Sequence, residues 1–294
     1  MHFGILRQDQ TVELVYQENQ QLAEGPLWYD GYLYWVDIKA CKLHQLNLDT
    51  REHRVRHFPQ QLTSIAPTRS GEFVVTTRDG VAGLADFDAS LKLLIDIEGS
   101  IPTNRFNDAK VDSYGNLWAG SMDDEETNVT GTLYRIDSNL TVTTEDTGYH
   151  ITNGPAFSRN GEFLYHTDSV LKKIYRFGLS KGGITDKQLF IELGPEHGHP
   201  DGMTVDDQGN IWVCEYGGWG ISTFDSTGKY LNKIEVPAAN VTSCSFGGKN
   251  LDTLFITTAA QGLTEAELTQ QPLAGSIFQT QPGVTGIASH LFNH

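Results

Sequence analysis

The feature of this sequence that most restricts its possible folds is a unit that recurs at intervals of 40 to 48 residues. In each copy a turn glycine precedes a short strand rich in aromatic and aliphatic residues. The marker glycines are Gly31, Gly71, Gly115, Gly161 and Gly209, with a weaker sixth copy at Gly247-Gly248. A period in this range is typical of repeat proteins, and one four-stranded propeller blade has about this length.

Further strands complete each unit. Third strands are expected at residues 42–48, 83–87, 131–136, 173–177, 220–224 and 275–279, and more variable fourth strands at 53–57, 142–145 and 231–236. One short helix is expected at 264–268, and a strand at 11–16 would complete the last unit. The pattern predicts an all-β fold, a six-bladed β-propeller with four-stranded antiparallel blades, as a single domain over residues 1–294. A pair of β-sandwiches with accidental spacing is the alternative.

Charge and cysteine content limit the class of protein. The 294 residues carry a formal net charge of −16, so neither nucleic acid nor an anionic membrane is expected as a partner. Residues 1–10 lack the apolar core of a secretory signal, and no apolar run has the length of a transmembrane helix. Cys41, Cys214 and Cys244 have no metal-binding spacing. Cys214 and Cys244 are predicted to be buried free thiols, which indicates a cytoplasmic protein.

A polar residue stands seven or eight positions before each marker glycine, at the head of the first strand of its unit. These heads are Glu24, Thr63-Ser64, Asn107, Asn153 and Asp201, and Thr242-Ser243 takes the same place in the sixth copy. The innermost strand of a propeller blade lines the central channel. The heads are therefore expected to face one common axis.

Two explanations account for the heads. Asn, Asp and Ser are favoured in turns, which explains any one of them taken singly. Two carboxylates and two amides on one axis would be costly to bury without partners, and a bound cation would satisfy them. Carboxylate and amide oxygens without Cys or His suit a hard divalent ion such as Ca²⁺, Mg²⁺ or Mn²⁺, with zinc and iron left open.

A second polar cluster is expected in the third unit. Arg105 offers a planar fork of donors near the channel mouth, suited to hydroxyl or carboxylate oxygens of a ligand. The acidic run at 123–126 is either a solvated loop or a ligand-facing one. The loop with His197 and His199 enters the fifth unit at the same rim, and either a histidine touches substrate there or the loop is an ordinary rim loop.

Several of these stretches together resemble one protein family. They are AEGPLW at 23–28, YWVDI at 34–38, NRFNDAKVD at 104–112, TNG at 152–154, PDGM at 200–203 and TSCSFGGKN at 242–250. With these stretches the chain is similar, over nearly its whole length, to the senescence marker protein (regucalcin), gluconolactonase and luciferin-regenerating family of six-bladed propellers.

The resemblance implies roles for particular residues. It implies a set of metal ligands, namely Glu24, Asn153 and Asp201. It also implies a set of substrate-binding residues, namely Arg105, Asn107 and Glu125. The three implied metal ligands are all heads of first strands, which the repeat already suggested as cation ligands. Asn107, implied to bind substrate, is also such a head.

The expected activity is that of a lactonase, a carboxylic ester hydrolase: the metal-dependent hydrolysis of a sugar lactone (an aldonolactone, gluconolactone-like) to the aldonic acid. One divalent ion would act as Lewis acid and activate water, and Asp201 would be the catalytic base. Ca²⁺ is the first candidate for this ion, and Zn²⁺, Mn²⁺, Mg²⁺ and Fe²⁺ are left open. Lactones are activated esters, and the chain has no G-x-S-x-G nucleophile motif. The expected partner is the small-molecule sugar lactone, and the protein is expected to be a monomer or small homo-oligomer.

Three other functions stay open at this point. A non-catalytic Ca²⁺-binding regulatory protein of the regucalcin type would not need a guanidinium such as that of Arg105 beside its ion. A hydrolase of organophosphates or aromatic esters would need an apolar pocket mouth. A protein-interaction propeller seldom places two carboxylates on its axis.

Overall fold

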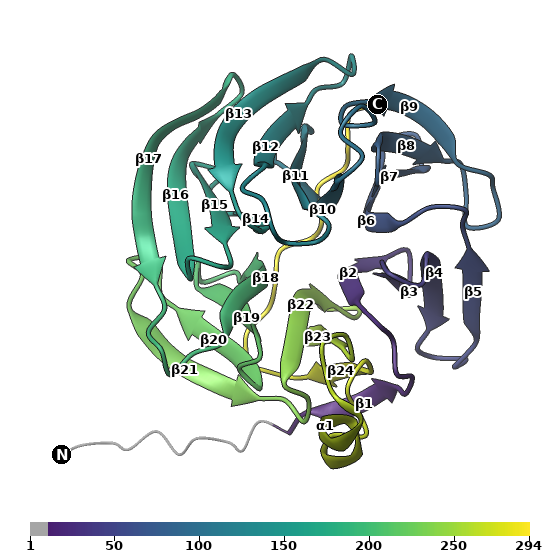
Figure 1. Ribbon diagram of the computed structural model, residues 1–294, viewed down its shortest axis with the longest axis vertical. Helices are drawn as coiled ribbons and strands as arrows, with labels where there is room; N and C mark the ends of the chain where they lie inside the picture. The colour runs from purple at the N-terminus through teal and green to yellow at the C-terminus, as the bar shows by residue number, and fades with distance from the viewer. Residues whose placement is uncertain (1–10) are drawn as a thin grey trace.

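Six four-stranded antiparallel sheets surround a central axis in the computed structural model, which describes residues 11–294 (Figure 1). Five sheets are each built from four strands that are consecutive in the chain, and the sixth takes its outer strand from the other end of the chain. The predicted six-bladed β-propeller is confirmed. The expectation that residues 1–10 contain no secretory signal lies outside the described residues.

The strands of each blade follow in order from the axis outward. Blade one has β2 (Ala23–Tyr29), β3 (Tyr32–Asp37), β4 (Lys42–Asn47) and β5 (His53–His57). Blade two has β6 (Leu62–Pro67), β7 (Phe73–Thr77), β8 (Gly80–Leu84) and β9 (Lys92–Asp96). Blade three has β10 (Asn104–Val111), β11 (Leu117–Asp123), β12 (Gly131–Ile136) and β13 (Val142–Tyr149). Blade four has β14 (Thr152–Phe157), β15 (Phe163–Asp168), β16 (Lys173–Ser180) and β17 (Gly183–Glu192). Blade five has β18 (His199–Val205), β19 (Ile211–Tyr216), β20 (Gly220–Phe224) and β21 (Tyr230–Glu235). Blade six has β22 (Asn240–Gly247), β23 (Thr253–Ala259), β24 (Ile277–Thr280) and β1 (Glu13–Tyr16).

The ring is closed by the two ends of the chain. Strand β1 pairs antiparallel with β24, so that Glu13 lies opposite Gln279 and Leu14 opposite Phe278. The expected closing strand at 11–16 is therefore confirmed. Closure in this way pairs an edge of the last sheet with a strand from the N-terminal part of the chain, which joins the blades into a ring.

The turn between the first two strands of a blade has a local explanation in blade five. Asp206 accepts hydrogen bonds from the backbone N–H of Gln208 (2.9 Å) and of Asn210 (2.8 Å), and from Nε1 of Trp212 (3.0 Å). Gly209 lies between them with φ of 88°, a conformation that L side chains rarely adopt. Asp, Gly and Trp at this spacing therefore form one structural device, which Asp112, Gly115 and Trp118 repeat in blade three.

One expected strand lies elsewhere than predicted. In blade two the third strand β8 begins at Gly80 instead of residue 83. The Thr77 hydroxyl donates to the carbonyl oxygen of Gly80 (3.1 Å) and closes a tight turn directly after β7. A Cβ on Gly80 would lie 2.2 Å from the carbonyl oxygen of Ile95, so the close approach of the next strand requires glycine here.

The short helix α1 (Glu265–Gln270) lies in the connection between β23 and β24. Thr264 is its N-cap and forms a capping box: its side chain accepts from the N–H of Glu267, whose carboxylate accepts from the N–H of Thr264. The predicted helix is confirmed. No helix in residues 11–294 is long and apolar enough to cross a membrane.

Large side chains buried between the blades form the core. Trp35, Trp118, Phe106, Phe255 and Phe278 are all less than 2% exposed. Burying a side chain of this kind contributes about 1.5–3 kcal/mol, so the inter-blade layers are a major source of stability. Cys214 and Cys244 are buried and free, as predicted.

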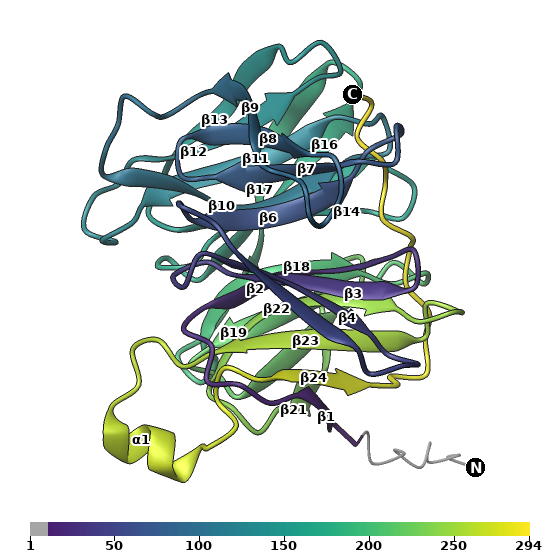
Figure 2. The same cartoon turned by 90° about the vertical axis from the view of Figure 1, so that its right-hand side faces the viewer.

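The C-terminal segment crosses the end of the channel that is remote from the strand heads (Figure 2). It forms bridges to residues just beyond the inner strands, between Thr68 and Phe292 and between Asp206 and Gly286. A cavity of about 110 Å³ lies on the axis above this segment, and Asp108 and His290 are among the residues that line it. The segment therefore covers this end of the channel.

Candidate functional site

Every blade contains a β-bulge at the head of its innermost strand. The register between the first and second strands shifts at the same place in all six: between Glu24 and Leu27, Leu62 and Ser64, Phe106 and Ala109, Asn153 and Ala156, Pro200 and Met203, and Val241 and Ser243. A bulge leaves a residue unpaired and redirects its side chain. The bulge thus leaves Asn107 and Asp201 unpaired, whereas Glu24 and Asn153 are the last paired residues before their bulges.

Three carboxylates from three blades lie within electrostatic range of one another. Glu24, Asp108 and Asp201 are 5%, 4% and 7% exposed. Burial, with the nearby charge of Asp108, raises the pKa of Glu24 to about 8. Burial also raises the pKa of Asp108 to about 6. Burial and the charges of Glu24 and Asp108 raise the pKa of Asp201 well above its usual value. These groups repel one another, and the positive charge of Arg105 opposes the effect of burial on the pKa of Glu24 and Asp201.

The donor set fits a hard divalent cation. Oδ2 of Asp108 is buried without a hydrogen-bond partner, which is costly unless an ion or water satisfies it. The predicted ligands Glu24, Asn153 and Asp201 offer carboxylate and amide oxygens only, the ligand type that Ca²⁺ and Mg²⁺ prefer. Within residues 11–294 no group of three or more His, Cys, Asp or Glu side chains is arranged as a metal site. The predicted set includes one amide oxygen, that of Asn153.

The two head amides are hydrogen-bonded to each other. Nδ2 of Asn107 donates to Oδ1 of Asn153 (3.0 Å) and to the carbonyl oxygen of Thr152 (2.7 Å). Nδ2 of Asn153 donates to the hydroxyl of Ser169 (2.9 Å), which in turn donates to the carbonyl oxygen of Pro200 (2.7 Å). These contacts fix the amide of Asn153 with its oxygen toward Asn107, and the oxygen keeps a second lone pair for a cation.

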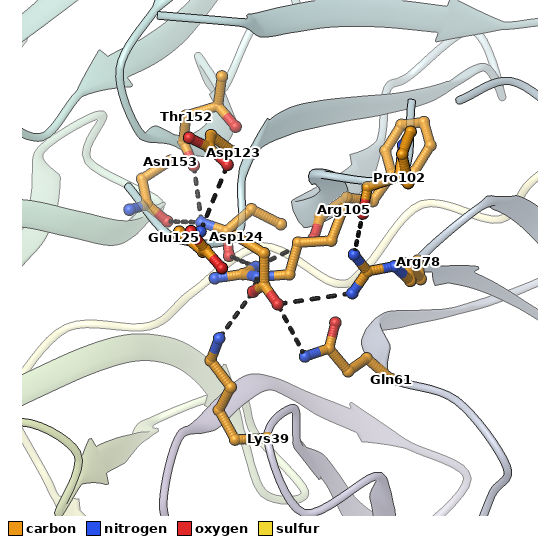
Figure 3. Close-up of polar contacts among 12 residues, drawn as sticks. Lys39, Gln61, Arg78, Pro102, Arg105, Asp123, Asp124, Glu125, Thr152 and Asn153 are labelled. Carbon is orange, nitrogen blue, oxygen red and sulfur yellow. Dashed lines mark hydrogen bonds and ion pairs between the residues drawn. The ribbon is translucent and has the colours of Figure 1, made fainter. Parts of the chain in front are cut away.

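Arg105 lies next to this amide pair. Its Nη1 donates to Oδ1 of Asn107 (2.6 Å) and to the carbonyl oxygen of Phe106 (3.0 Å). Its Nε donates to Asp124 (2.5 Å), as Figure 3 shows. The charge of Arg105 acts against burial on the pKa of both Glu24 and Asp201, so the guanidinium lies close to the carboxylates. The structure thus brings the predicted Arg105 and Asn107 to the predicted metal ligands.

The hydroxyl-bearing heads Thr63, Ser64 and Thr242 form hydrogen bonds within their own blade or to the neighbouring blade. Thr63 and Ser64 each hydrogen-bond to the hydroxyl of Thr76 (2.7 and 2.6 Å). Thr242 donates to the carbonyl oxygen of Ala23 (2.6 Å). These hydrogen bonds to protein groups account for the three hydroxyl side chains without a ligand. Oγ of Ser243, by contrast, is buried without a hydrogen-bond partner.

The other predicted contact residues lie at the rim. Glu125 is exposed in the loop after β11, and no hydrogen bond within residues 11–294 joins its carboxylate to Arg105 or Asn107. His197 contacts the buried carboxylate of Glu215 through Nδ1 (2.9 Å), and His199 contacts the carbonyl oxygen of Ser169 (2.9 Å). Both histidines therefore hold the rim loop in place.

Three residues of the site were not assigned from the sequence: Asp108, Asp124 and Ser169. Asp108 follows a head residue directly, and the bulge places both Asn107 and Asp108 at the site. Asp124 lies in an acidic run and Ser169 just after a strand, positions that have no distinctive sequence pattern. The paired polar residues Asn107-Asp108 were the one usable signal.

Fold and site together define a six-bladed β-propeller with a buried set of carboxylate and amide oxygens on its axis. The sequence model of the family described as the SMP-30/Gluconolactonase/LRE-like region matches residues 22–260, and the chain belongs to this family.

Named relatives resemble the chain over nearly its whole length. The pentonolactonase XacC of Haloferax volcanii is 33% identical over 284 residues, which cover 94% of this chain and 96% of the relative. The 6-deoxy-6-sulfogluconolactonase of Pseudomonas putida is 30% identical over 288 residues, 97% of this chain and 99% of the relative. The crystal structure of the calcium-binding protein regucalcin from Agrobacterium tumefaciens superposes with a TM-score of 0.94 and 25% identity, covering 97% of this chain and 98% of that chain. The chain is thus similar both to lactone-hydrolysing enzymes and to a calcium-binding protein.

Proposed function

We propose that this protein is a metal-dependent lactonase that hydrolyses a sugar lactone, of the aldonolactone type, to the aldonic acid. The observation that carries the proposal is the convergence of Glu24, Asp108 and Asp201 with the hydrogen-bonded amides of Asn107 and Asn153 at the heads of the inner strands. The likeness to the pentonolactonase and the sulfogluconolactonase supports the substrate class.

Glu24, Asn153 and Asp201 would hold one divalent ion, with Ca²⁺ the first candidate. When bound, such an ion supplies Lewis-acid polarisation of a carbonyl and lowers the pKa of water. The likeness to the calcium-binding regucalcin supports a divalent ion. The unsatisfied oxygen of Asp108 and the mutual repulsion of the buried carboxylates support its place on the axis.

The residues of this chain would divide the remaining work. Asp201 would accept a proton from the attacking water, and its burial makes it a stronger base than an exposed aspartate. Arg105 and Asn107 would bind ring oxygens of the lactone, since both are buried and fixed by hydrogen bonds. Glu125 would contact a hydroxyl of the bound lactone from the rim, where its carboxylate is exposed.

A second function, that of a non-catalytic Ca²⁺-binding regulatory protein of the regucalcin type, is favoured by the similarity to the Agrobacterium structure. Against it, the fixed guanidinium of Arg105 lies beside the ion-binding oxygens. A protein that only binds a cation gains nothing from a positive charge at that place.

Lactone hydrolysis followed by pH-stat tests both functions. The protein is treated with a chelator, single metals are restored, and a panel of aldonolactones is offered. Turnover that requires metal and falls by about 100-fold or more in Asp201→Asn supports the lactonase. Tight metal binding with no lactone opened above the spontaneous rate rejects the lactonase and favours the regulatory protein.

A further inference from the structure

Asp124 is the centre of an ion cluster at the mouth of the site (Figure 3). Its Oδ1 accepts from Nε of Arg105 (2.5 Å) and from Nζ of Lys39 (2.7 Å). Its Oδ2 accepts from Nε2 of Gln61 (3.3 Å) and lies 3.6 Å from Nη1 of Arg78. We call these five residues the Asp124 clasp.

The clasp joins three blades. Lys39 follows β3 in blade one, Gln61 and Arg78 flank β6 and β7 in blade two, and Arg105 and Asp124 belong to blade three. Surface ion pairs contribute little because water screens them. Here the side chains of Arg105 and Asp124 are only 3% and 17% exposed, so the charge-assisted hydrogen bond between them is strong.

The clasp determines which N–H donors of Arg105 remain available to a ligand. Nε is bound to Asp124, and Nη1 is bound to Asn107 and to the carbonyl oxygen of Phe106. Nη2 has no hydrogen-bond partner within residues 11–294. A guanidinium is planar, so fixing two of its nitrogens also fixes the direction of the third. Nη2 therefore keeps two oriented N–H donors for a ligand.

We propose that Asp124 is a positioning residue, which holds the guanidinium of Arg105 in the orientation that binds the lactone through Nη2 and does not itself touch the substrate. This inference rests on the proposed lactonase function. Burial raises the pKa of Asp124, but the hydrogen bonds from Lys39 and Arg105 outweigh that effect and lower the pKa to about 2. The carboxylate of Asp124 is therefore ionised at any working pH.

A double-mutant cycle in lactone hydrolysis tests the clasp, using the metal-loaded full chain as wild type, Asp124→Ala, Arg105→Ala and the double variant. Because Asp124 acts through Arg105, we expect Asp124→Ala to lower kcat/KM by about 10- to 100-fold. The double variant should equal Arg105→Ala within about twofold, since nothing is left for Asp124 to position. Metal affinity should stay within about twofold of wild type.

Glu145→Ala is the matched control. Glu145 also accepts a hydrogen bond from an arginine Nε, that of Arg135 at 2.6 Å, but in the outer strands of blade three. The kcat/KM of the Glu145→Ala variant should stay within about twofold of that of the wild type. If Asp124→Ala folds poorly, Asp124→Asn keeps an acceptor oxygen for Nε and should show a smaller loss that again vanishes in the Arg105→Ala background.

The possible outcomes distinguish a failure of the positioning role of Asp124 from a failure of the proposed lactonase function. Losses that multiply in the double variant, or wild-type kcat/KM in Asp124→Ala, overturn the positioning role while lactonase activity stands. If the wild type opens no lactone, the lactonase proposal fails, and the same four proteins are compared for binding of gluconate by calorimetry. Non-additive losses in gluconate affinity then support the clasp, and additive losses or no binding by the wild type overturn it.

Discussion

Nδ2 of Asn107 lies 3.0 Å from Oδ1 of Asn153, so a hydrogen bond between blades three and four joins the two halves of the site. Asn153 belongs to the predicted metal ligands. Asn107 also accepts from Nη1 of Arg105, the predicted substrate-binding residue. Because the amide of Asn107 contacts both groups directly, a change at Asn107 itself should affect both the substrate-binding residue and the metal ligand.

Asn107→Ala tests this coupling. The substitution removes the acceptor of Arg105 and the donor of Asn153 at once, so both groups lose a fixed orientation. We expect kcat/KM for the best aldonolactone to fall by about 100-fold and metal affinity by about 10-fold. Asn139→Ala, in an exposed turn of the same blade, should change neither value. A loss in only one of the two measurements would show that the halves are independent.

Ser169→Ala tests the support of the metal ligand alone. Ser169 accepts from Nδ2 of Asn153 and thereby fixes which end of the amide is turned toward Asn107. Without the hydroxyl the amide of Asn153 can rotate, so metal affinity measured by chelator competition should fall by about 10- to 100-fold. Ser180→Ala, in an exposed turn of the same blade, is the control. Unchanged affinity in a folded Ser169→Ala would show that the hydroxyl does not orient the ligand.

The turn device of the repeat predicts a stability difference between two aspartates of blade five. Asp206→Ala leaves several buried donors unsatisfied, among them Nε1 of Trp212, and should lower the free energy of unfolding by about 3 kcal/mol. Asp225 accepts from the N–H of Thr227 and of Lys229 in an exposed turn, so Asp225→Ala should lower the free energy of unfolding much less than Asp206→Ala does. Urea unfolding of both variants provides the comparison, and equal losses would contradict the buried role of Asp206.

The fold could be predicted because its determinants are local and repeated. A turn glycine ahead of an apolar strand recurs along the chain, so its spacing gives the number of blades, and Asp112, Gly115 and Trp118 repeat the whole turn of blade five in blade three. The heads Glu24, Asn153 and Asp201 could be found for the same reason, since each is at a fixed distance from a turn glycine. The third strand of blade two was misplaced because Gly80 is required by contact with a neighbouring strand, and no local pattern reveals that contact.

The supporting residues could not be predicted, because their partners are distant in sequence. Asp124 meets Lys39 and Gln61, which are 85 and 63 residues away. Ser169 meets Asn153 and Pro200 from a turn without a distinctive pattern. Loops of different blades come together only in the closed ring. A single sequence therefore shows which residues near the mouth are polar, but it does not show which of them form hydrogen bonds or ion pairs with one another.

A buried histidine in blade four makes stability depend on pH. His166 is fully buried, neither ring nitrogen has a hydrogen-bond partner, and burial lowers its pKa to about 3. Below the unfolded-state pKa of about 6.5, the unfolded chain takes up a proton that the folded chain does not, so the free energy of unfolding falls as pH falls. His166 alone should account for a loss of about 2 kcal/mol between pH 8 and pH 5. His166→Phe, which retains an aromatic contact with Tyr149, should remove this part of the pH dependence in chemical unfolding at the two pH values. The exposed His57, changed to Gln, should leave the dependence as in wild type, and a His166→Phe protein with the full wild-type dependence would contradict the assignment.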